Sequence, residues 1–330
     1  MKNMRYIYTF FFFILIISCS NSIKTTVTPK DYLDEVFKIV EEHSIRRDSV
    51  DFNKIKRDAY ARLKYVNYSG NCYPIIKIIL KDLGDRHSFY MPKEQVEKLQ
   101  TPSNINEVIT FSAKLEDQNI GYIRMKGFGK IDSLSIRQYA DSLQNLIKSI
   151  DNAKLKGWVL DIRENNGGNC WPMLAGLGPL LGEGVCGYFI KNDHTRNSWF
   201  YQNGKSGIDS VAIVSVSKKP YTLINNLNPI AVLTGNHTAS SGEVVATAFR
   251  KKNNLRSFGE STRGLSTGNS SYKLSDGSML ILTTSIYADK QGNVLGGKIE
   301  PDEIIKSFDK SNSQSNDLVL QRAVNWIYEN

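Results

Sequence analysis

The segment PIAVLTGNHTASSGEVVATAF (229–249) places an apolar strand, a tight turn and a helix in direct succession. The run before Gly235 is typical of a strand covered on both faces, and the residues after Ser240 predict a helix. Ser240 and Glu243 have the spacing of a capping box. The same serine lies at a helix N-terminus, where free N–H groups and the helix dipole stabilise an alkoxide or an oxyanion. Ser240 is therefore either a helix cap or a nucleophile.

Two further segments carry residues suited to chemistry. WVLDIRENNGGNC (158–170) predicts a strand that runs into Gly167 and Gly168 before another helix. Consecutive glycines at the carboxyl end of a strand allow close backbone approach and outward-pointing amides, which suit an oxyanion. In LKDLGDRHSFY (80–90), His87 follows a helix stop in a polar stretch, where it can reach a partner.

The order of predicted elements indicates the fold class. Three helical patterns follow Thr28 and predict an N-terminal helical domain over 28–104; the second has Ile55, Ala59, Leu63 and Val66 on one face. From about residue 107, strands alternate with helices, including one over 133–150, which is typical of an α/β core of βαβ units. A hairpin turning at Asp276-Gly277 and a C-terminal helix with Leu318, Ala323 and Ile327 on one face complete the chain.

The first residues are typical of an export signal. Lys2 and Arg5 precede an apolar run over 7–17, which is too short to span a bilayer as a helix. The sequence IISC ending at Cys19 resembles a bacterial lipobox, in which the cysteine becomes the lipidated N-terminus. We expect a signal peptide over 1–18, a lipid tether over 19–27, and a lipoprotein of the bacterial cell envelope, periplasmic or in the outer membrane.

Composition and charge are those of an ordinary globular protein, with 41% hydrophobic and 23% charged residues. The net charge of +9 is spread along the chain, so no nucleic-acid partner is expected. Beyond the leader, Cys72, Cys170 and Cys186 match no metal-ligand spacing and are expected to be buried thiols. The pattern indicates no metal and no cofactor.

Five motifs in order resemble peptidase family S41, which includes the C-terminal processing proteases and the tricorn protease. They are the three segments around His87, Gly167 and Ser240, together with FGESTRG (258–264) and LSDGSMLILTT followed by KIEPDEII (274–305). The resemblance extends over about residues 30 to 305 and implies a crotonase/ClpP-like βαβ core with β-rich additions. It also implies a peptidase domain over 105–330, preceded by the small helical bundle.

Carried over by position, the resemblance makes Ser240 the nucleophile. The backbone N–H of Ser241, with that of Gly167 or Gly168, would form the oxyanion hole. Asp161 and Arg163 would orient the Gly-Gly turn.

The chain departs from the processing proteases at their catalytic lysine, since Leu265 occupies that position. Leucine cannot accept a proton, and Arg263 stays charged near neutral pH. The tricorn-like branch uses a histidine from the N-terminal part as the base, and His87 stands at the matching place. An imidazole suits this role because its pKa lies near neutrality. His237 is the rival and is interpreted as a turn residue, while His43 is interpreted as structural.

A third residue is expected to orient the imidazole. Glu260, Glu300 and Asp302 are all candidates, and the sequence does not choose among them. Only about 30 residues separate Ser88 from Gly121, whereas a PDZ domain, common in the processing proteases, needs roughly 80 or more. Recognition of a substrate's free C-terminus through such a domain is therefore not expected.

The sequence thus predicts an exported, lipid-anchored serine endopeptidase that hydrolyses peptide bonds in peptides or unfolded proteins. The alternative is a non-catalytic peptide- or lipid-binding protein on the same scaffold, since a fold does not determine chemistry.

Overall fold

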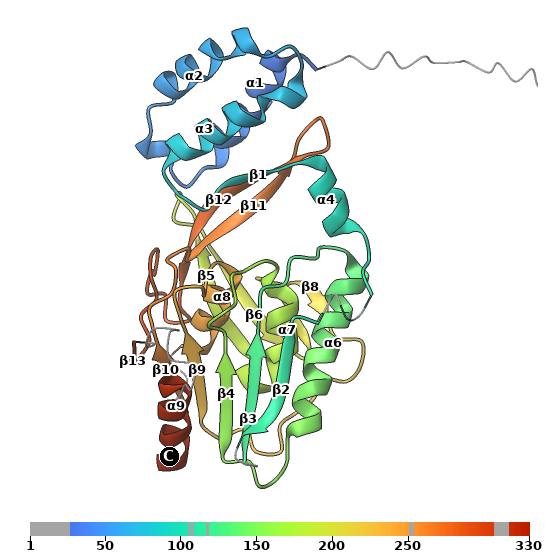
Figure 1. Ribbon diagram of the computed structural model, residues 1–330, viewed down its shortest axis with the longest axis vertical. Helices are drawn as coiled ribbons and strands as arrows, with labels where there is room; N and C mark the ends of the chain where they lie inside the picture. The colour runs from blue at the N-terminus through green and yellow to red at the C-terminus, as the bar shows by residue number, and fades with distance from the viewer. Residues whose placement is uncertain (1–26, 105, 107–108, 117–118, 251–253, 307–316) are drawn as a thin grey trace, which may run out of the picture.

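A six-stranded sheet forms the centre of the lower body in the computed structural model (Figure 1). The structure describes residues 27–104, 106, 109–116, 119–250, 254–306 and 317–330. In spatial order the strands are β13 (Glu303–Ile304), β10 (Leu255–Gly259), β9 (Ile230–Thr234), β4 (Gly157–Asp161), β3 (Ile120–Met125) and β2 (Phe111–Glu116). All neighbours run parallel except β2 and β3. Strands β4 and β9 are buried along their whole length, as their apolar runs predict.

Helices cover both faces of this sheet. On one face lie α6 (Ser133–Ile150), α7 (Cys170–Leu181) and α8 (Ser241–Phe249), and on the other lies α9 (Leu318–Glu329). The alternation of side chains along a strand divides the two cores: Leu160 and Val232 pack with the first group of helices, whereas Val159 and Leu233 pack with α9. The α/β class predicted from the sequence is therefore confirmed.

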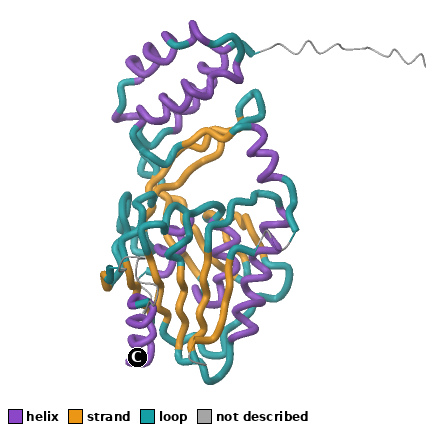
Figure 2. Tube along the Cα trace, viewed as in Figure 1, coloured by secondary structure: helices purple, strands orange, loops and turns teal. Residues whose placement is uncertain are grey.

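A second sheet of seven strands is antiparallel. Its path is β1 (Phe89–Met91), β12 (Met279–Ala288), β5 (Gly184–Ile190), β6 (Arg196–Gln202), β7 (Lys205–Ile208) and β8 (Val211–Ser215), with β11 (Thr267–Lys273) paired to β12. The hairpin of β11 and β12 turns at Asp276-Gly277, as predicted. Figure 2 shows this hairpin rising from the body toward the helices at the N-terminal end.

The N-terminal segment forms helices α1 (Pro29–His43), α2 (Phe52–Ala61) and α3 (Tyr73–Leu83), followed by α4 (Lys93–Gln100). Thr28 caps α1 by accepting from the Asp31 N–H, and Gly84 ends α3 with φ 75°. The second helical pattern continues in sequence to Val66, but α2 ends at Ala61. A short 3₁₀ turn at Leu63–Tyr65 follows it and still packs Leu63 and Val66 against the bundle core.

The helical bundle is not separate from the rest of the chain. Its core includes Leu274, Leu280 and Leu282 from the β11–β12 hairpin, and the Tyr32 hydroxyl lies 2.9 Å from Ser278 Oγ. The hairpin therefore joins the helices to the body, and the domain boundaries expected from the sequence remain predictions.

The predicted signal peptide, Cys19 and almost all of the tether lie in residues 1–26, outside the described residues. Among the helices that the structure describes, none combines the length and apolarity needed to cross a membrane.

Candidate active site

Ser240 lies in the turn between β9 and α8, at the N-cap position of α8. Its N–H donates to Glu243 Oε2 at 2.8 Å, which is the glutamate half of the predicted capping box, whereas the Ser240 side chain makes no cap hydrogen bond. The backbone of Ser240 has φ 51° and ψ −116°, a strained conformation for a residue with a side chain. Such strain costs roughly 1–3 kcal/mol and is concentrated at functional sites. Capping therefore does not exclude a chemical role for the hydroxyl.

His87 lies next to this hydroxyl although it is 153 residues away in sequence. His87 Nε2 lies 3.0 Å from Ser240 Oγ, and the other ring nitrogen, Nδ1, lies 2.7 Å from Thr267 Oγ1. If Nδ1–H donates to Thr267, Nε2 carries the lone pair that accepts from Ser240. This is the arrangement of a nucleophile and a general base. The structure thus brings together the two residues that the sequence analysis paired.

The loop that carries His87 is fixed by hydrogen bonds at both ends. Asp85 Oδ1 accepts from the His87 N–H at 2.8 Å and from the Ser88 N–H at 2.7 Å, and Asp85 Oδ2 accepts from Ser88 Oγ at 2.7 Å. On the other side, Asn269 Nδ2 of β11 donates to the His87 carbonyl at 3.1 Å. The loop and the hairpin therefore both fix the backbone of His87, and this backbone position helps to orient the imidazole.

Burial keeps this imidazole neutral. Removal from water lowers the pKa of His87 from its ordinary 6.5 to about 4, while the nearby Asp85 carboxylate acts in the opposite direction. A neutral imidazole is the form that accepts a proton, so His87 can act as a base at neutral pH.

The acid limb of the rate profile tests this environment. Because only neutral His87 accepts the Ser240 proton, kcat/KM should fall as the pH drops through about 4 and should be level from pH 5.5 to 7.5. Asp85→Asn removes the charge that raises the pKa of His87 and should move the midpoint to lower pH. A midpoint at or above 6.5, measured by hydrolysis of a quenched fluorescent peptide, would contradict the described burial.

The Thr267 hydroxyl stands where a carboxylate was expected to orient the imidazole. The two ring nitrogens of His87 face Thr267 and Ser240 rather than an acid. Of the three proposed acids, Asp302 accepts at Oδ2 from Ser257. A hydroxyl can accept the Nδ1 proton and fix the tautomer, but it adds no charge to stabilise an imidazolium.

Replacement of Thr267 tests the role of that hydroxyl. Thr267→Val keeps the shape of the side chain but removes the acceptor, so kcat should fall about 10–100-fold with little change in KM. Thr267→Ser is the matched control and should retain most of the activity, because it keeps the oxygen. Equal rates for the valine and serine variants would show that the hydroxyl does not position His87.

Gly167 and Gly168 adopt φ values of 107° and 115°, which side chains rarely tolerate. A Cβ at Gly168 would lie 2.0 Å from the Phe128 carbonyl oxygen, and one at Gly167 would lie 2.8 Å from Ser240 Cβ. The Gly167 N–H donates to Asn165 Oδ1 at 3.1 Å. Neither the Gly168 N–H nor the Ser241 N–H donates to another described residue, so these two amides are open to an oxyanion.

The Gly-Gly turn is tied to the serine turn because β4 and β9 are adjacent and parallel, so their carboxyl ends meet. Ser241 Oγ donates to the Gly168 carbonyl at 2.6 Å, and the Ala239 N–H donates to the Asn165 carbonyl at 2.9 Å. Asn165 is fully buried and bonds both turns. This role of Asn165 was not predicted from the sequence, although its position just before the two glycines could have indicated it.

Asp161 and Arg163 bond to each other and to the C-terminal helix, and their expected role in orienting the Gly-Gly turn stays a prediction. Arg163 Nη2 donates to Asp161 Oδ2 at 2.6 Å and to Asp317 Oδ2 at 2.7 Å. Asp317 is the N-cap of α9, and Tyr122 also donates to Asp161. These bonds fasten α9 to the strand that leads into the Gly-Gly turn.

Glu243 has a second role that the capping box did not reveal. Its buried Oε1 accepts from Thr262 Oγ1 at 2.5 Å and from the Gly264 N–H at 2.9 Å. Burial raises its pKa above the ordinary value. Glu243 thus joins the serine turn to the segment that contains Leu265 and leads to Thr267.

The remaining histidines named in the sequence analysis lie away from the pair. His237 is exposed in the turn before Ser240, and His43 stacks on Tyr272 with ring centroids 5.0 Å apart. Cys72, Cys170 and Cys186 are buried free thiols, as expected, and burial raises their pKa values. Within the described ranges, no group of three or more His, Cys, Asp or Glu side chains is placed to hold a metal ion.

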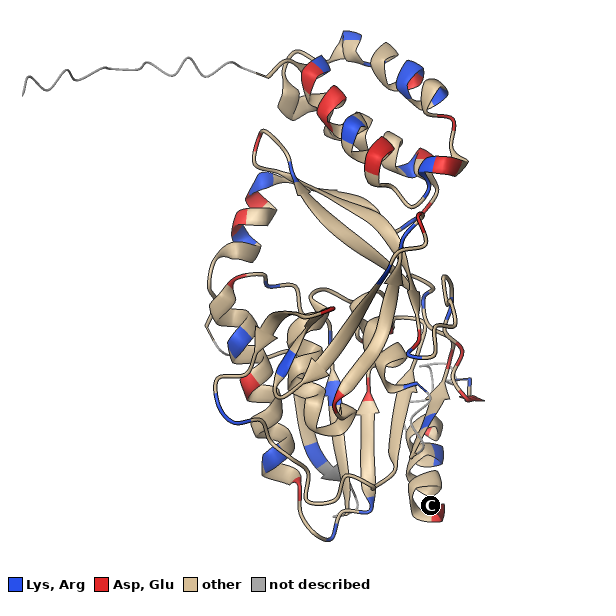
Figure 3. Ribbon diagram, turned by 180° about the vertical axis from the view of Figure 1, so that it is seen from behind, with Lys and Arg blue, Asp and Glu red and all other residues tan. Residues whose placement is uncertain are grey.

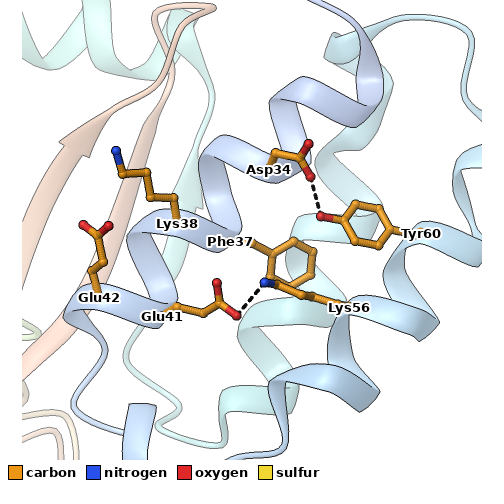
Figure 4. A pocket seen from close by; sticks show the side chains of 7 residues that line it. All are labelled: Asp34, Phe37, Lys38, Glu41, Glu42, Lys56 and Tyr60. Carbon is orange, nitrogen blue, oxygen red and sulfur yellow. Dashed lines mark hydrogen bonds and ion pairs between the residues drawn. The ribbon is translucent and has the colours of Figure 1, made fainter.

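A pocket on the helical bundle has no comparable chemistry (Figure 4). Four of its polar side chains form two pairs, since Lys56 Nζ lies 2.6 Å from Glu41 Oε1 and the Tyr60 hydroxyl donates to Asp34. Phe37 lies between these pairs. Lys38 and Glu42 complete the charged lining, which carries both signs.

The fold and the site define an α/β protein in which a serine at a helix N-terminus lies within hydrogen-bond distance of a histidine. The sequence model of peptidase family S41 matches residues 119–305, more than half of the 330 residues, and the chain belongs to this family. Ser240 lies inside the matched range, whereas His87 lies outside it.

Several known proteins are similar to this chain. The nisin-resistance protein of Lactococcus lactis subsp. lactis is 27% identical over 302 residues, which cover 91% of this chain and 87% of that protein. The carboxy-terminal processing protease CtpA of Bacillus subtilis is 26% identical over 187 residues, but these cover 56% of this chain and only 34% of the protease. Family membership and these relatives support a serine-type peptidase.

A solved structure of a lipoprotein from Streptococcus agalactiae has the same fold, with a TM-score of 0.74 and 24% identity. The alignment covers 92% of this chain and 96% of that one, so the similarity includes the N-terminal helices as well as the sheet.

Proposed function

We propose that this protein is an exported, lipid-anchored serine endopeptidase that hydrolyses peptide bonds in peptides or unfolded proteins. Ser240 is the nucleophile and His87 the general base. The observation that carries the proposal is the 3.0 Å contact between Ser240 Oγ and His87 Nε2 at the N-terminus of α8. A strained serine, a buried neutral imidazole and two open amides in one place suit acyl transfer.

The reaction follows from these positions. His87 Nε2 takes the hydroxyl proton as Ser240 Oγ attacks the scissile carbonyl carbon, and the N–H groups of Ser241 and Gly168 stabilise the resulting oxyanion. His87 then gives its proton to the leaving amine as the C–N bond breaks. In the second half, His87 takes a proton from water, the hydroxide attacks the acyl-enzyme, and the proton returns to Ser240.

The type of catalytic pair is Ser-His rather than Ser-Lys. Leu265 occupies the lysine position of the processing proteases, and it lies beside the site because Glu243 bonds the preceding Gly264. The described residues between Ser88 and Ile120 include β1, α4 and β2, which supports a chain without a PDZ domain there. We therefore do not extend the C-terminal processing of the relatives to this protein.

The leader and Cys19 support an envelope location, with the peptide substrate reaching the enzyme outside the cytoplasm. Similarity to a protein named for nisin resistance extends over 91% of the chain, which favours peptides as substrates.

Cys19→Ser should move the protein from the membrane fraction to the soluble fraction. Retention of this variant in the membrane fraction would contradict lipid anchoring through Cys19.

A fluorophosphonate probe tests the nucleophile directly. The wild-type protein should be labelled on Ser240, and both Ser240→Ala and His87→Ala should abolish labelling. His237→Ala is the matched control and should label normally, because His237 is an exposed turn residue. A well-folded wild-type protein that takes no label would favour the non-catalytic binding protein instead.

A further inference from the structure

A large cleft adjoins the Ser240–His87 pair. It has a volume of about 940 Å³, in the range of ligand-binding sites, and is lined by residues of the His87 loop, the 263–267 segment, β5 and the 294–298 segment. Arg86, directly before His87, lines it, and so does Thr267, whose hydroxyl contacts His87 Nδ1. Neither Ser240 nor His87 itself lines the cleft, which therefore adjoins the pair through Thr267, on the Nδ1 side of the imidazole.

The charged lining of this cleft is almost entirely of one sign. Its acid is Asp85, and its cations are Arg46, Arg86, Lys191, Arg263 and Lys298. All five cations are exposed, and none forms an ion pair with a described residue. One carboxylate does not balance five cations, and both oxygens of Asp85 already accept hydrogen bonds from His87 and Ser88.

This concentration of charge is local. On the helical bundle, acidic and basic residues are interspersed (Figure 3), and the pocket there is lined by charges of both signs. A cleft lined by one sign of charge focuses the field and raises the local concentration of ligands of the opposite sign. The unpaired cations therefore indicate an anionic ligand rather than a role in stability.

The cleft also offers apolar surface. Leu265, Ile190 and Ile286 line it and are partly exposed. The aliphatic stem of Lys298 lies against Gly264, which separates Arg263 from Leu265 in the chain. An apolar lining with a cationic rim suits a chain that carries both apolar and acidic side chains.

We propose that this cleft selects peptide substrates with acidic side chains beside the scissile bond. The inference rests on the proposed peptidase function and specifies its substrate class. A peptide is favoured over an anionic membrane surface because the cations line a recess that also contains Thr267, whose hydroxyl contacts His87.

Peptides that differ only in charge test the selectivity. In one quenched fluorescent sequence, three flanking positions are Glu, Gln or Lys in turn. The Glu peptide should have kcat/KM about 10-fold above the Gln peptide at low salt, and the Lys peptide should be the poorest. Because exposed charges are screened, the preference should shrink in 0.5 M NaCl. Equal kcat/KM values for Glu and Gln peptides would overturn the inference.

Charge reversal at the rim locates the selectivity. Arg263→Glu/Lys298→Glu should lose the preference for the Glu peptide and favour the Lys peptide. The side chains replaced make no recorded hydrogen bond, so the fold should persist. Lys218→Glu/Lys219→Glu, at exposed lysines remote in sequence, removes the same charge and should keep the preference.

Binding separates this inference from the peptidase proposal. Fluorescence anisotropy with the Ser240→Ala protein should show tighter binding of the Glu peptide than of the Gln peptide. This difference in affinity should disappear when Arg263→Glu and Lys298→Glu are added to the Ser240→Ala protein. If wild-type protein cleaves nothing but this binding pattern is found, the peptidase proposal fails and the acidic selectivity stands. Cleavage without any charge preference in binding or rate overturns the selectivity alone. Binding of these cations to anionic phosphatidylglycerol vesicles, with no discrimination between peptides, would also overturn it.

Discussion

Ser240→Ala is expected to lower kcat by about 10⁴-fold or more, and His87→Ala by a similar factor, since each removes a member of one proton-transfer unit. The Ser240→Ala/His87→Ala double variant should be no slower than the single variants, because the two side chains act together. The measurement is hydrolysis of a quenched fluorescent peptide under single-turnover conditions. The residual rate reflects substrate binding and the amides at Gly168 and Ser241, which these changes leave in place.

The control for this prediction is the other histidine close to Ser240 in sequence. His237 is exposed three residues before Ser240, and His237→Ala should keep near wild-type kcat. Additive losses in the double variant would mean that His87 and Ser240 act separately. If kcat falls as much in His237→Ala as in His87→Ala, the assignment of the base to His87 is wrong.

Local sequence patterns predicted most of the elements that surround this pair. The helix over 133–150 has the bounds that its apolar spacing predicts, and the buried run at 230–234 is a strand covered on both faces. The second helix was predicted too long, because Leu63 and Val66 continue a helical spacing. A 3₁₀ turn places these two side chains against the same core, so the apolar pattern does not distinguish the two geometries.

The partner of His87 Nδ1 could not be predicted in this way. Thr267 lies 180 residues from His87 in sequence, and the contact depends on the register of the β11–β12 hairpin against β1. No local pattern encodes that register. The expectation of a carboxylate came from the logic of serine triads, whereas the structure supplies a hydroxyl there and a carboxylate, Asp85, on the backbone side of the loop.

The His87 assignment arose for a different reason. Leu265 occupies the position of the lysine in the processing proteases, so another base was needed. His87 was chosen because it stands where the tricorn-like branch has its histidine, not because of any local geometry. Its position depends on α3 ending at Gly84 and on the bonds from Asp85 and Asn269. These contacts join the helical bundle to the β-rich body, which makes the N-terminal segment part of the site.

Gly167→Ala is expected to damage the site more than the fold. The new Cβ would lie 2.8 Å from Ser240 Cβ and 3.1 Å from the Ala239 carbonyl oxygen, so the serine turn must move. A displacement of about 1 Å at a reacting centre costs on the order of 100-fold in rate. The φ of 107° adds a backbone strain of about 1–3 kcal/mol, so the Tm should also fall by several degrees.

Gly182→Ala separates these two effects. Gly182 also has a positive φ, 77°, but nothing lies within 4 Å of the added Cβ, at the end of α7. This variant should lose about 1–3 kcal/mol of stability, because φ 77° with ψ 166° is a conformation that essentially only glycine adopts, and it should keep its kcat/KM. If Gly167→Ala reduces Tm as much as Gly182→Ala while activity is unchanged, the Gly-Gly turn does not hold the nucleophile in place. A loss of activity confined to Gly167→Ala means that the close approach of this turn to Ser240, rather than general strain, sets the geometry of the reaction.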